Sequence, residues 1–244
     1  MRTIDINCDV GEGMANESLL MPFLSSCSIA CGGHYGTKST MDASIQLALK
    51  HNVKIGAHPS FPDQEHFGRV MLDMSPDDLK KSIQSQLEIF IARLSLFNAK
   101  LHHIKAHGAL YNLIAKDAVA ADNFLLSIQK YLSDCYVYVP YDSAIETKAL
   151  EKGVPIKYEA FADRNYHTDL SLVSRSHDHA VLSDPTAVCH HIKQMLFNNQ
   201  VATIEGALCT IKAETLCVHG DHSNSLEILK AITQFLKQHH IQLG

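Results

Sequence analysis

Short apolar runs alternate with longer stretches in which apolar residues recur every three or four positions, and this alternation continues along the whole chain. The short runs have the length and the content of branched and aromatic residues that are typical of strands, whereas the longer stretches have the spacing of amphipathic helices. We predict strands at residues 4–9, 28–32, 53–58, 102–107, 136–141, 156–161 and 215–220.

The predicted helices are clearest where capping residues precede an apolar stripe. Ser75 and Pro76 suit the cap and the first turn of a helix, and the two aspartates that follow complement the helix dipole. Asp184 and Pro185 open another helix in the same way. The last predicted helix has its apolar stripe at Leu226, Leu229, Ile232 and Leu236.

Repeated strand–helix alternation predicts an α/β fold with a parallel sheet, because each helix is the crossover between neighbouring strands. Such a sheet is either open and doubly wound or closed into a barrel. The length of 244 residues without a break in composition favours a single, TIM-like barrel domain over residues 1–244, with about seven parallel strands. Two β-like runs around Glu205 and Gly206 predict a hairpin inserted near residues 201–213.

Composition and charge exclude several classes of protein. The chain is 46% hydrophobic and 19% charged, so it can bury a core. Its net charge of −5 comes from 21 basic and 26 acidic residues without a long run of either sign, which argues against a nucleic-acid or anionic membrane partner. No apolar stretch approaches the roughly 20 residues of a membrane-spanning helix. Seven cysteines without a CxxC pair, and no signal-peptide pattern, are typical of a cytoplasmic protein with reduced thiols.

Four of the predicted strands end on residues that can do chemistry. Asp9, His58, His107 and His219 stand at or near the last positions of their runs. Because the C-terminal ends of parallel strands gather at one end of the sheet, where active sites of this fold class lie, we expect these side chains to converge. Further acidic and histidine residues lie at or follow the strand ends, at Glu12, His34, Glu159, Asp163 and Asp221.

Two kinds of chemistry suit this set of residues. Imidazoles and carboxylates hold Zn²⁺, Mn²⁺ or a similar ion, and the candidate metal ligands are Asp9, His34, His58 and His107. Alternatively, histidine and aspartate act as general bases without a metal, because the reference pKa of imidazole, about 6.5, lies near operating pH. The chain has no HExxH motif, so residue spacing does not decide between the two.

Two long loops follow strands on the expected functional side. They cover residues 58–75 and 162–183, and loops of this length in a compact domain are usually lids or binding loops. Each loop contains an arginine, Arg69 or Arg164, that suits a clamp on a carboxylate or phosphate group. The chain has neither a GxSxG elbow nor a P-loop.

Eight blocks of sequence run in order from residue 5 to residue 221, namely DINCDVGEG, SIACGGH, GAHPSFPD, FGR, KAHGALYN, EAFADRNY, LVSR and CVHGD. Together they resemble the LamB/YcsF family. The resemblance implies a barrel-like β/α fold similar to that of polysaccharide deacetylases, and ATP-driven hydrolysis of the lactam of 5-oxo-L-proline to L-glutamate. It also implies ATP with Mg²⁺ as cofactor, and two partner subunits, usually called B and C.

The resemblance also implies roles for individual residues. The expected catalytic residues are Asp9, His58, His107, Glu159 and Asp163. The residues expected to bind substrate or nucleotide are Asn7, Glu12, His34, Arg69, Tyr111, Asn112, Arg164, His219 and Asp221. Two positions depart from the usual family motifs and bear on substrate choice: Thr37 replaces an acidic residue, and Val70 replaces a second arginine.

Two other functions remain open on the sequence alone. A stand-alone, metal-dependent amidohydrolase or deacetylase would account for the histidines and carboxylates, and it would need a metal but no ATP. A non-catalytic subunit would bind the lactam and deliver it to a partner that holds the chemistry. In that case His107→Ala should weaken binding without specifically removing the chemical step.

Overall fold

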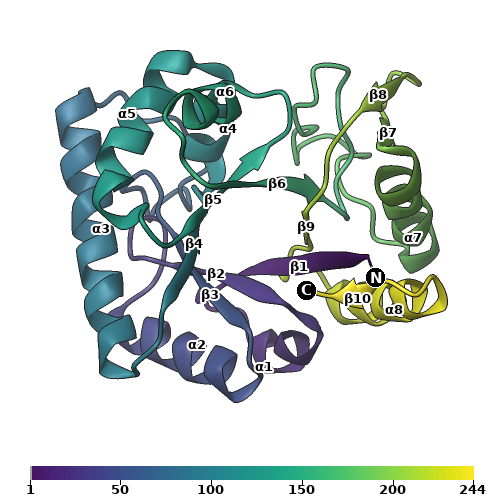
Figure 1. Ribbon diagram of the computed structural model, residues 1–244, viewed down its shortest axis with the longest axis horizontal. Coiled ribbons are helices and arrows are strands. Elements are labelled where there is room, and N and C mark those ends of the chain that lie inside the picture. Colours follow the sequence, from purple (N-terminus) through teal and green to yellow (C-terminus); the bar gives the residue numbers. More distant parts are fainter. Residues whose placement is uncertain (1) are drawn as a thin grey trace.

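The strands form a closed parallel barrel, shown in Figure 1 for a computed structural model that describes residues 2–244. Across these residues seven strands follow one another around the barrel, and β9 pairs with β1 to close it. In order around the barrel they are β1 (Thr3–Val10), β2 (Ser26–Ala30), β3 (Lys54–His58), β4 (Leu101–Ile104), β5 (Tyr136–Pro140), β6 (Ile156–Phe161) and β9 (Thr215–Cys217). The predicted α/β barrel is confirmed.

Helices surround the barrel and fill most of the connections between its strands (Figure 1). Ser75 caps α3 (Pro76–Leu96) by accepting a hydrogen bond from the amide of Asp78, and Asp184 caps α7 (Pro185–Lys193) by accepting one from the amide of Ala187, as predicted. Within residues 2–244, no helix combines the length and apolar content needed to cross a lipid bilayer. The helices are α1 (Glu17–Leu20), η1 (Met21–Phe23), α2 (Lys38–Lys50), α3 (Pro76–Leu96), α4 (Gly108–Lys116), α5 (Ala118–Ile128), η2 (Gln129–Tyr131), α6 (Ala144–Glu151), α7 (Pro185–Lys193), the π-helical turn η3 (Gln194–Asn198) and α8 (Ser225–Gln238).

Three short strands lie outside the ring. β10 (Gln242–Leu243) pairs in parallel with the start of β1, so the first and last strands lie side by side (Figure 1). β7 (Gln200–Ala202) and β8 (Leu208–Thr210) form an antiparallel hairpin between α7 and β9. A backbone bridge joins the turn of this hairpin to the long loop after β6, on the side of the barrel where that loop emerges.

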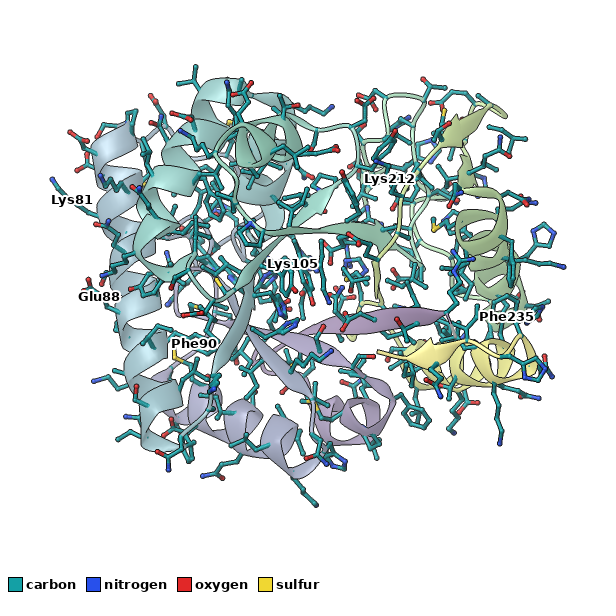
Figure 2. All side chains as sticks on the ribbon, in the orientation of Figure 1. Lys81, Glu88, Phe90, Lys105, Lys212 and Phe235 are labelled. Carbon is teal, nitrogen blue, oxygen red and sulfur yellow. The ribbon has the colours of Figure 1, made fainter. Side chains whose placement is uncertain are left out.

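The interior of the barrel is polar. Alternate residues of a strand point to opposite faces, so Ile6 of β1 joins the hydrophobic core whereas Asn7 points into the barrel. Asn7 donates hydrogen bonds inside the barrel to Glu159 (3.0 Å) and Thr215 (2.7 Å). Figure 2 shows Lys105 near the centre of the barrel. The strands therefore turn many of their polar residues inward and bury apolar ones on their outer face.

The predicted strand at residues 102–107 is wrong at its C-terminal end. β4 ends at Ile104, and the next three residues lie outside the sheet. The amide of His107 donates to the carbonyl of Pro59 (2.9 Å), which belongs to the loop after β3. His107 is therefore the N-cap of α4 rather than the last residue of a strand.

The predicted strand at residues 215–220 is also too long. β9 ends at Cys217, and the amide of His219 donates to the carboxylate of Asp163 (2.8 Å) instead of to a neighbouring strand. Both strands are therefore shorter than predicted, although the first amide beyond each end still donates to a neighbouring strand, that of Lys105 to Ala57 of β3 (3.0 Å) and that of Val218 to Asn7 of β1 (2.9 Å).

Gly56 of β3 provides a test of packing inside the barrel. A Cβ atom at this position would overlap the ring of His103, which is fully buried on β4. We expect Gly56→Ala to lower the free energy of unfolding, measured by urea denaturation, by about 1–3 kcal/mol, as overpacking does in other cores. Adding His103→Ala removes the overlapping ring and should recover part of this loss. If the losses in free energy of unfolding caused by the two substitutions simply add, residue 56 does not press on the ring of His103.

Candidate active site

A cavity of about 380 Å³ opens at the C-terminal ends of the barrel strands. It is lined by segments that are far apart in the chain and meet at the rim. Most of the residues predicted from the sequence belong to this lining, namely Asp9, Glu12, His58, Arg69, His107, Tyr111, Asn112, Arg164, His219 and Asp221.

Four other predicted residues lie behind the wall of the cavity. Asn7, His34, Glu159 and Asp163 are almost completely buried, and within the described part of the chain they do not belong to the cavity lining. They contact residues of the lining instead and hold those residues in position. Asn7 and His34 therefore lie one layer behind the cavity surface, and their predicted part in binding substrate or nucleotide stays a prediction.

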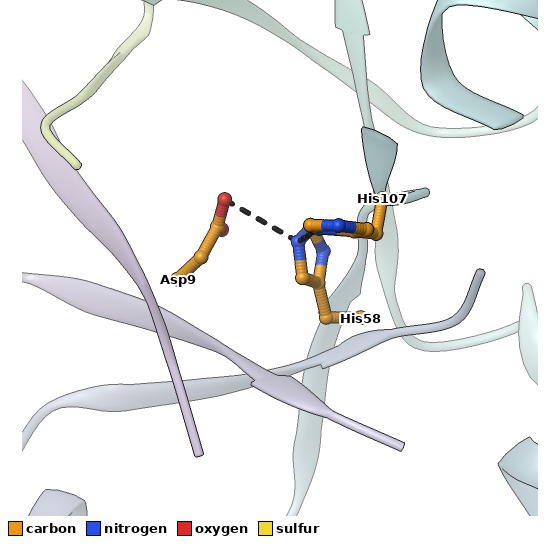
Figure 3. Close-up of side chains that lie close together, drawn as sticks. All are labelled: Asp9, His58 and His107. Atoms are coloured by element: carbon orange, nitrogen blue, oxygen red, sulfur yellow. Dashed lines mark hydrogen bonds and ion pairs between the residues drawn. The ribbon is translucent and has the colours of Figure 1, made fainter. Parts of the chain in front are cut away.

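Asp9, His58 and His107 meet at the inner end of the cavity (Figure 3). His58 Nε2 lies 3.3 Å from Asp9 Oδ2 and 2.9 Å from His107 Nδ1. The second nitrogen of each ring faces a backbone carbonyl, that of Lys105 for His58 (2.8 Å) and that of Phe67 for His107 (2.9 Å). Each ring donates its N–H to that carbonyl, so two neutral rings would aim lone pairs at one another. The arrangement therefore requires a cation between the rings, either a proton or a metal ion.

The charges around the two rings move their pKa values in opposite directions. Burial lowers the pKa of His58, but the adjacent Asp9 carboxylate more than offsets this, and the pKa is raised overall. The pKa of His107 falls well below its usual range, because of burial and of the positive charge on His58. Burial raises the pKa of Asp9, but His58 and Lys105 bring it well below the usual value. A proton shared by the rings therefore resides on His58, next to the ionised Asp9.

Glu12 and His34 form a second pair beside the first. Glu12 Oε1 lies 2.8 Å from His34 Nε2 and 3.5 Å from His107 Nδ1. The ring of His34 stacks on that of His107 with centroids 3.7 Å apart. Burial and the negative charge of Asp9 raise the pKa of Glu12 to about 7, whereas burial and the charge of His58 lower the pKa of His34 to about 3. His34 therefore stays neutral and holds Glu12 in place.

Lys105 is a buried cation at the same end of the cavity. Its Nζ lies 2.8 Å from Glu159 Oε1, 3.0 Å from Asp9 Oδ1 and 3.2 Å from Cys217 Sγ. Burial opposes the charge, but the negative groups around it, Asp9 first, raise the pKa of Lys105 well above its usual value. The protein thus keeps a positive charge at a point where a developing oxyanion can be stabilised.

Asp163 and His219 form a hydrogen-bonded dyad on another wall. Asp163 accepts hydrogen bonds from Nδ1 (2.9 Å) and from the amide (2.8 Å) of His219, and His222 Nε2 lies 3.4 Å from its second oxygen. Burial raises the pKa of Asp163, but the charge and hydrogen bonds of His219 bring it well below the usual range. The carboxylate fixes Nδ1 as the protonated nitrogen and leaves Nε2 of His219 available to a group in the cavity.

Sequence reasoning missed three residues of this region, Lys105, Arg175 and His222. The signal for Lys105 is its alternation with His103 and His107, which places all three on the same side of an extended segment. Arg175 lines the cavity, and His222 lies against Asp163. Both belong to loops, whose conformation depends on tertiary contacts that periodicity does not reveal.

Comparison with known proteins agrees with this architecture. The LamB/YcsF family profile matches residues 4–244. The chain is 36% identical over 243 residues to a protein of Haemophilus influenzae (strain PittEE) that is named as the A subunit of 5-oxoprolinase, covering 100% of this chain and 99% of that protein. A lactam utilization protein from Thermus thermophilus superimposes with a TM-score of 0.91 and 29% identity, over 99% of this chain and 98% of that one. The peptidoglycan deacetylase PdaC from Bacillus subtilis (TM-score 0.51, 10% identity, 99% and 86% covered) shares the fold alone.

Replacement of Lys105 tests the buried ion network. Lys105→Met keeps much of the side-chain volume but leaves Asp9 and Glu159 without their shared cation. We expect the free energy of unfolding, measured by chemical denaturation, to fall by about 3–5 kcal/mol, because a buried charge is left unpaired. Lys105→Met combined with Glu159→Gln should recover part of the loss. Strictly additive losses would show that the lysine and the glutamate are not coupled.

Proposed function

Because the chain belongs to the LamB/YcsF family, we propose that it is the A subunit of an ATP-dependent 5-oxoprolinase. Such an enzyme opens the lactam of 5-oxo-L-proline to give L-glutamate. One observation carries the proposal: the H. influenzae relative, which bears the name of that subunit, matches this chain from end to end. The likeness of the whole fold to a lactam utilization protein supports the same class of substrate.

The cavity contains groups that suit the opening of a lactam. Hydrolysis needs a base that takes a proton from water, a positive group near the carbonyl oxygen, and an acid for the departing nitrogen. His219, oriented by Asp163, suits the base, and the ammonium group of Lys105 suits the positive group. After it accepts the proton of water, His219 can pass that proton to the ring nitrogen, so one residue serves as base and then as acid.

The need for ATP has a chemical reason. The amide of a five-membered lactam is stabilised by resonance, and the opened ring recloses readily because amine and acyl group stay tethered. Phosphorylation of the carbonyl oxygen removes that resonance and makes the ring carbon electrophilic. Water then adds to this carbon, the C–N bond breaks as the nitrogen takes a proton, and hydrolysis of the resulting acyl phosphate releases phosphate and L-glutamate.

We also propose that Mg²⁺-bound ATP and two partner subunits, B and C, take part in the reaction. The name of the H. influenzae relative supports a multi-subunit assembly. The chain has no P-loop, so ATP binds either to a partner or to a site of another type on this chain. The seven cysteines are all free thiols, which supports a location in the reducing cytoplasm.

The inner end of the cavity also fits a divalent transition metal. Asp9, His58 and His107 each offer one ligand atom, and these atoms lie within 4.8 Å of one another. Both rings donate their second N–H to a backbone carbonyl, which is how metal-binding histidines are commonly held. A bound ion would supply Lewis-acid chemistry, polarising a carbonyl or acidifying a water molecule.

This donor set favours a second candidate function, a metal-dependent amidohydrolase or deacetylase that acts alone. Its activity would need the metal and not ATP. Lys105 argues for the first candidate, because Asp9 Oδ1 already faces an ammonium group at 3.0 Å and is thereby less available to a second cation. The delivery of substrate to a partner by a non-catalytic subunit is a third possibility, which the kinetics of variants can separate from the first.

The decisive assay measures glutamate formed from 5-oxo-L-proline, with and without ATP, by the chain alone and with B and C subunits. We expect glutamate only with ATP and partners. Asp163→Asn should then lower kcat about 10²- to 10⁴-fold with little change in KM, because His219 loses its orienting carboxylate. Asp178→Asn, an exposed change in the same loop, is the matched control.

Other outcomes of this assay point elsewhere. Turnover by the chain alone that is independent of ATP and abolished by a chelator would support the amidohydrolase. A higher KM for Asp163→Asn with unchanged kcat would support the delivery subunit. No glutamate from a folded chain with active partners would exclude 5-oxo-L-proline as the substrate.

Metal binding can be measured without any reaction. Titration of the metal-free chain with Co²⁺ should produce saturable visible absorption bands at about one equivalent, since nitrogen and carboxylate ligands give Co²⁺ characteristic spectra. His107→Ala should lose the bands because it removes one ligand, whereas His177→Ala, an exposed histidine of the loop after β6, should keep them. Bands of equal strength in His107→Ala, or none in the unmodified chain, would leave a shared proton as the cation between the rings.

A further inference from the structure

Two arginines from different loops share one carboxylate at the wall of the cavity. Arg69 belongs to the loop after β3 and Arg175 to the loop after β6, and Asp221 follows β9. Asp221 Oδ2 lies 3.2 Å from Arg69 Nη2 and 2.6 Å from Arg175 Nη1. All three side chains line the cavity that contains Lys105 and His219.

Arg164, the arginine that the sequence singles out in the loop after β6, bonds to the backbone of its own loop. Its Nε donates to the carbonyl of Ala180 (3.2 Å) and its Nη2 to that of Val173 (2.5 Å). Both acceptors are backbone groups of the loop itself, and the side chain is almost completely buried. Arg164 therefore holds the loop in shape, and the guanidinium group that this loop presents next to Arg69 is that of Arg175.

The arginine pair has unused capacity for an anion. Each guanidinium group carries five N–H donors, yet the described contacts with Asp221 use one nitrogen of each. Two positive charges face a single negative one, so the group keeps a net positive charge at the cavity. The side chains of Arg69 and Arg175 are 48% and 32% exposed, which leaves both accessible to a ligand. Arginine is well suited to carboxylates because its planar fork donates two parallel hydrogen bonds.

We propose that Arg69 and Arg175 bind the ring carboxylate of the substrate, and that Asp221 holds the two guanidinium groups in place until the substrate arrives. This inference rests on the proposed function and adds to it a determinant of substrate choice. With its carboxylate on the arginines, the lactam ring lies in the cavity that Lys105 and His219 also line, so both can reach its carbonyl group. The site then selects lactams that carry a carboxylate over neutral lactams of the same shape.

The simpler alternative is that Asp221 ties the two loops together and that the arginines never touch substrate. The two explanations differ in what they predict for a neutral substrate. A tether supports turnover of every lactam equally. A carboxylate clamp contributes only when the substrate carries the negative charge.

The test compares 5-oxo-L-proline with its uncharged carboxamide, 5-oxo-L-prolinamide, in the assembly with B and C subunits. We expect Arg175→Gln and Arg69→Gln to lower kcat/KM for the carboxylate about 10- to 100-fold relative to the carboxamide, the range of lost charge-assisted hydrogen bonds. Because the partner subunits are the same in every assay, a change in the ratio of the two kcat/KM values is caused by the substitution in this chain. Arg93→Gln breaks an arginine–aspartate pair between α2 and α3 and should leave the ratio unchanged.

An equal loss with both lactams in Arg175→Gln would overturn the proposal and identify a tether. If the assembly makes no glutamate, the proposed function itself fails. The binding of a carboxylate by the two arginines is then tested by a direct binding measurement. Calorimetric titration of the chain with cyclopentanecarboxylate and with cyclopentanecarboxamide should then show binding of the anion that Arg175→Gln abolishes. Absence of anion binding, or equal binding by the variant, would overturn the clamp.

Discussion

The ammonium group of Lys105 lies inside the barrel between the carboxylates of Asp9 and Glu159. Removal of such charges from water is costly, so each of them needs a partner of good geometry. The surrounding strands meet this demand with further polar side chains, among them Asn7, which bonds to Glu159 and to Thr215. The interior therefore cannot be filled with apolar residues, and a polar column extends from the middle of the barrel to the cavity.

The cavity combines a rigid inner end with walls made by loops. The inner end consists of side chains at or just beyond strand ends, whose rings are fixed by backbone carbonyls and by stacking. The wall near Asp221 is built from loops, and its shape depends on Arg164, which bonds to the backbone of its own loop. Substitutions in these loops can therefore change the shape of this wall without disturbing the side chains at the inner end.

Most of the fold followed from the periodicity of the sequence, because strand and helix patterns alternate clearly and capping residues mark the starts of α3 and α7. The convergence of Asp9, His58 and His107 also followed, since parallel strands end at one rim. The buried ammonium group of Lys105 could not be predicted in this way. Periodicity separates the two faces of a strand, but it does not show which face lies inside the barrel.

The two departures from the family motifs that bear on substrate choice, Thr37 and Val70, have different structural settings, which the sequence did not distinguish. Thr37 is the N-cap of α2, where it forms a reciprocal capping box with Thr40, so its hydroxyl serves the helix. Val70 is 45% exposed and follows Arg69 at the cavity wall. Local hydrogen bonding explains the first residue, whereas the second stands where a longer side chain would have room in solvent.

Closure of the barrel joins distant parts of the chain. β9 pairs with β1, and the hydroxyl of Thr215 donates to Asp5, which stands 210 positions earlier. A ribosome completes the first strand long before its partner exists, so the acids of that strand remain hydrated and its edge unpaired through most of synthesis. The contacts of that strand with β9 can form only after residue 215 has been made. Until the barrel closes, the unpaired edge of the first strand therefore leaves the nascent chain open to misassociation.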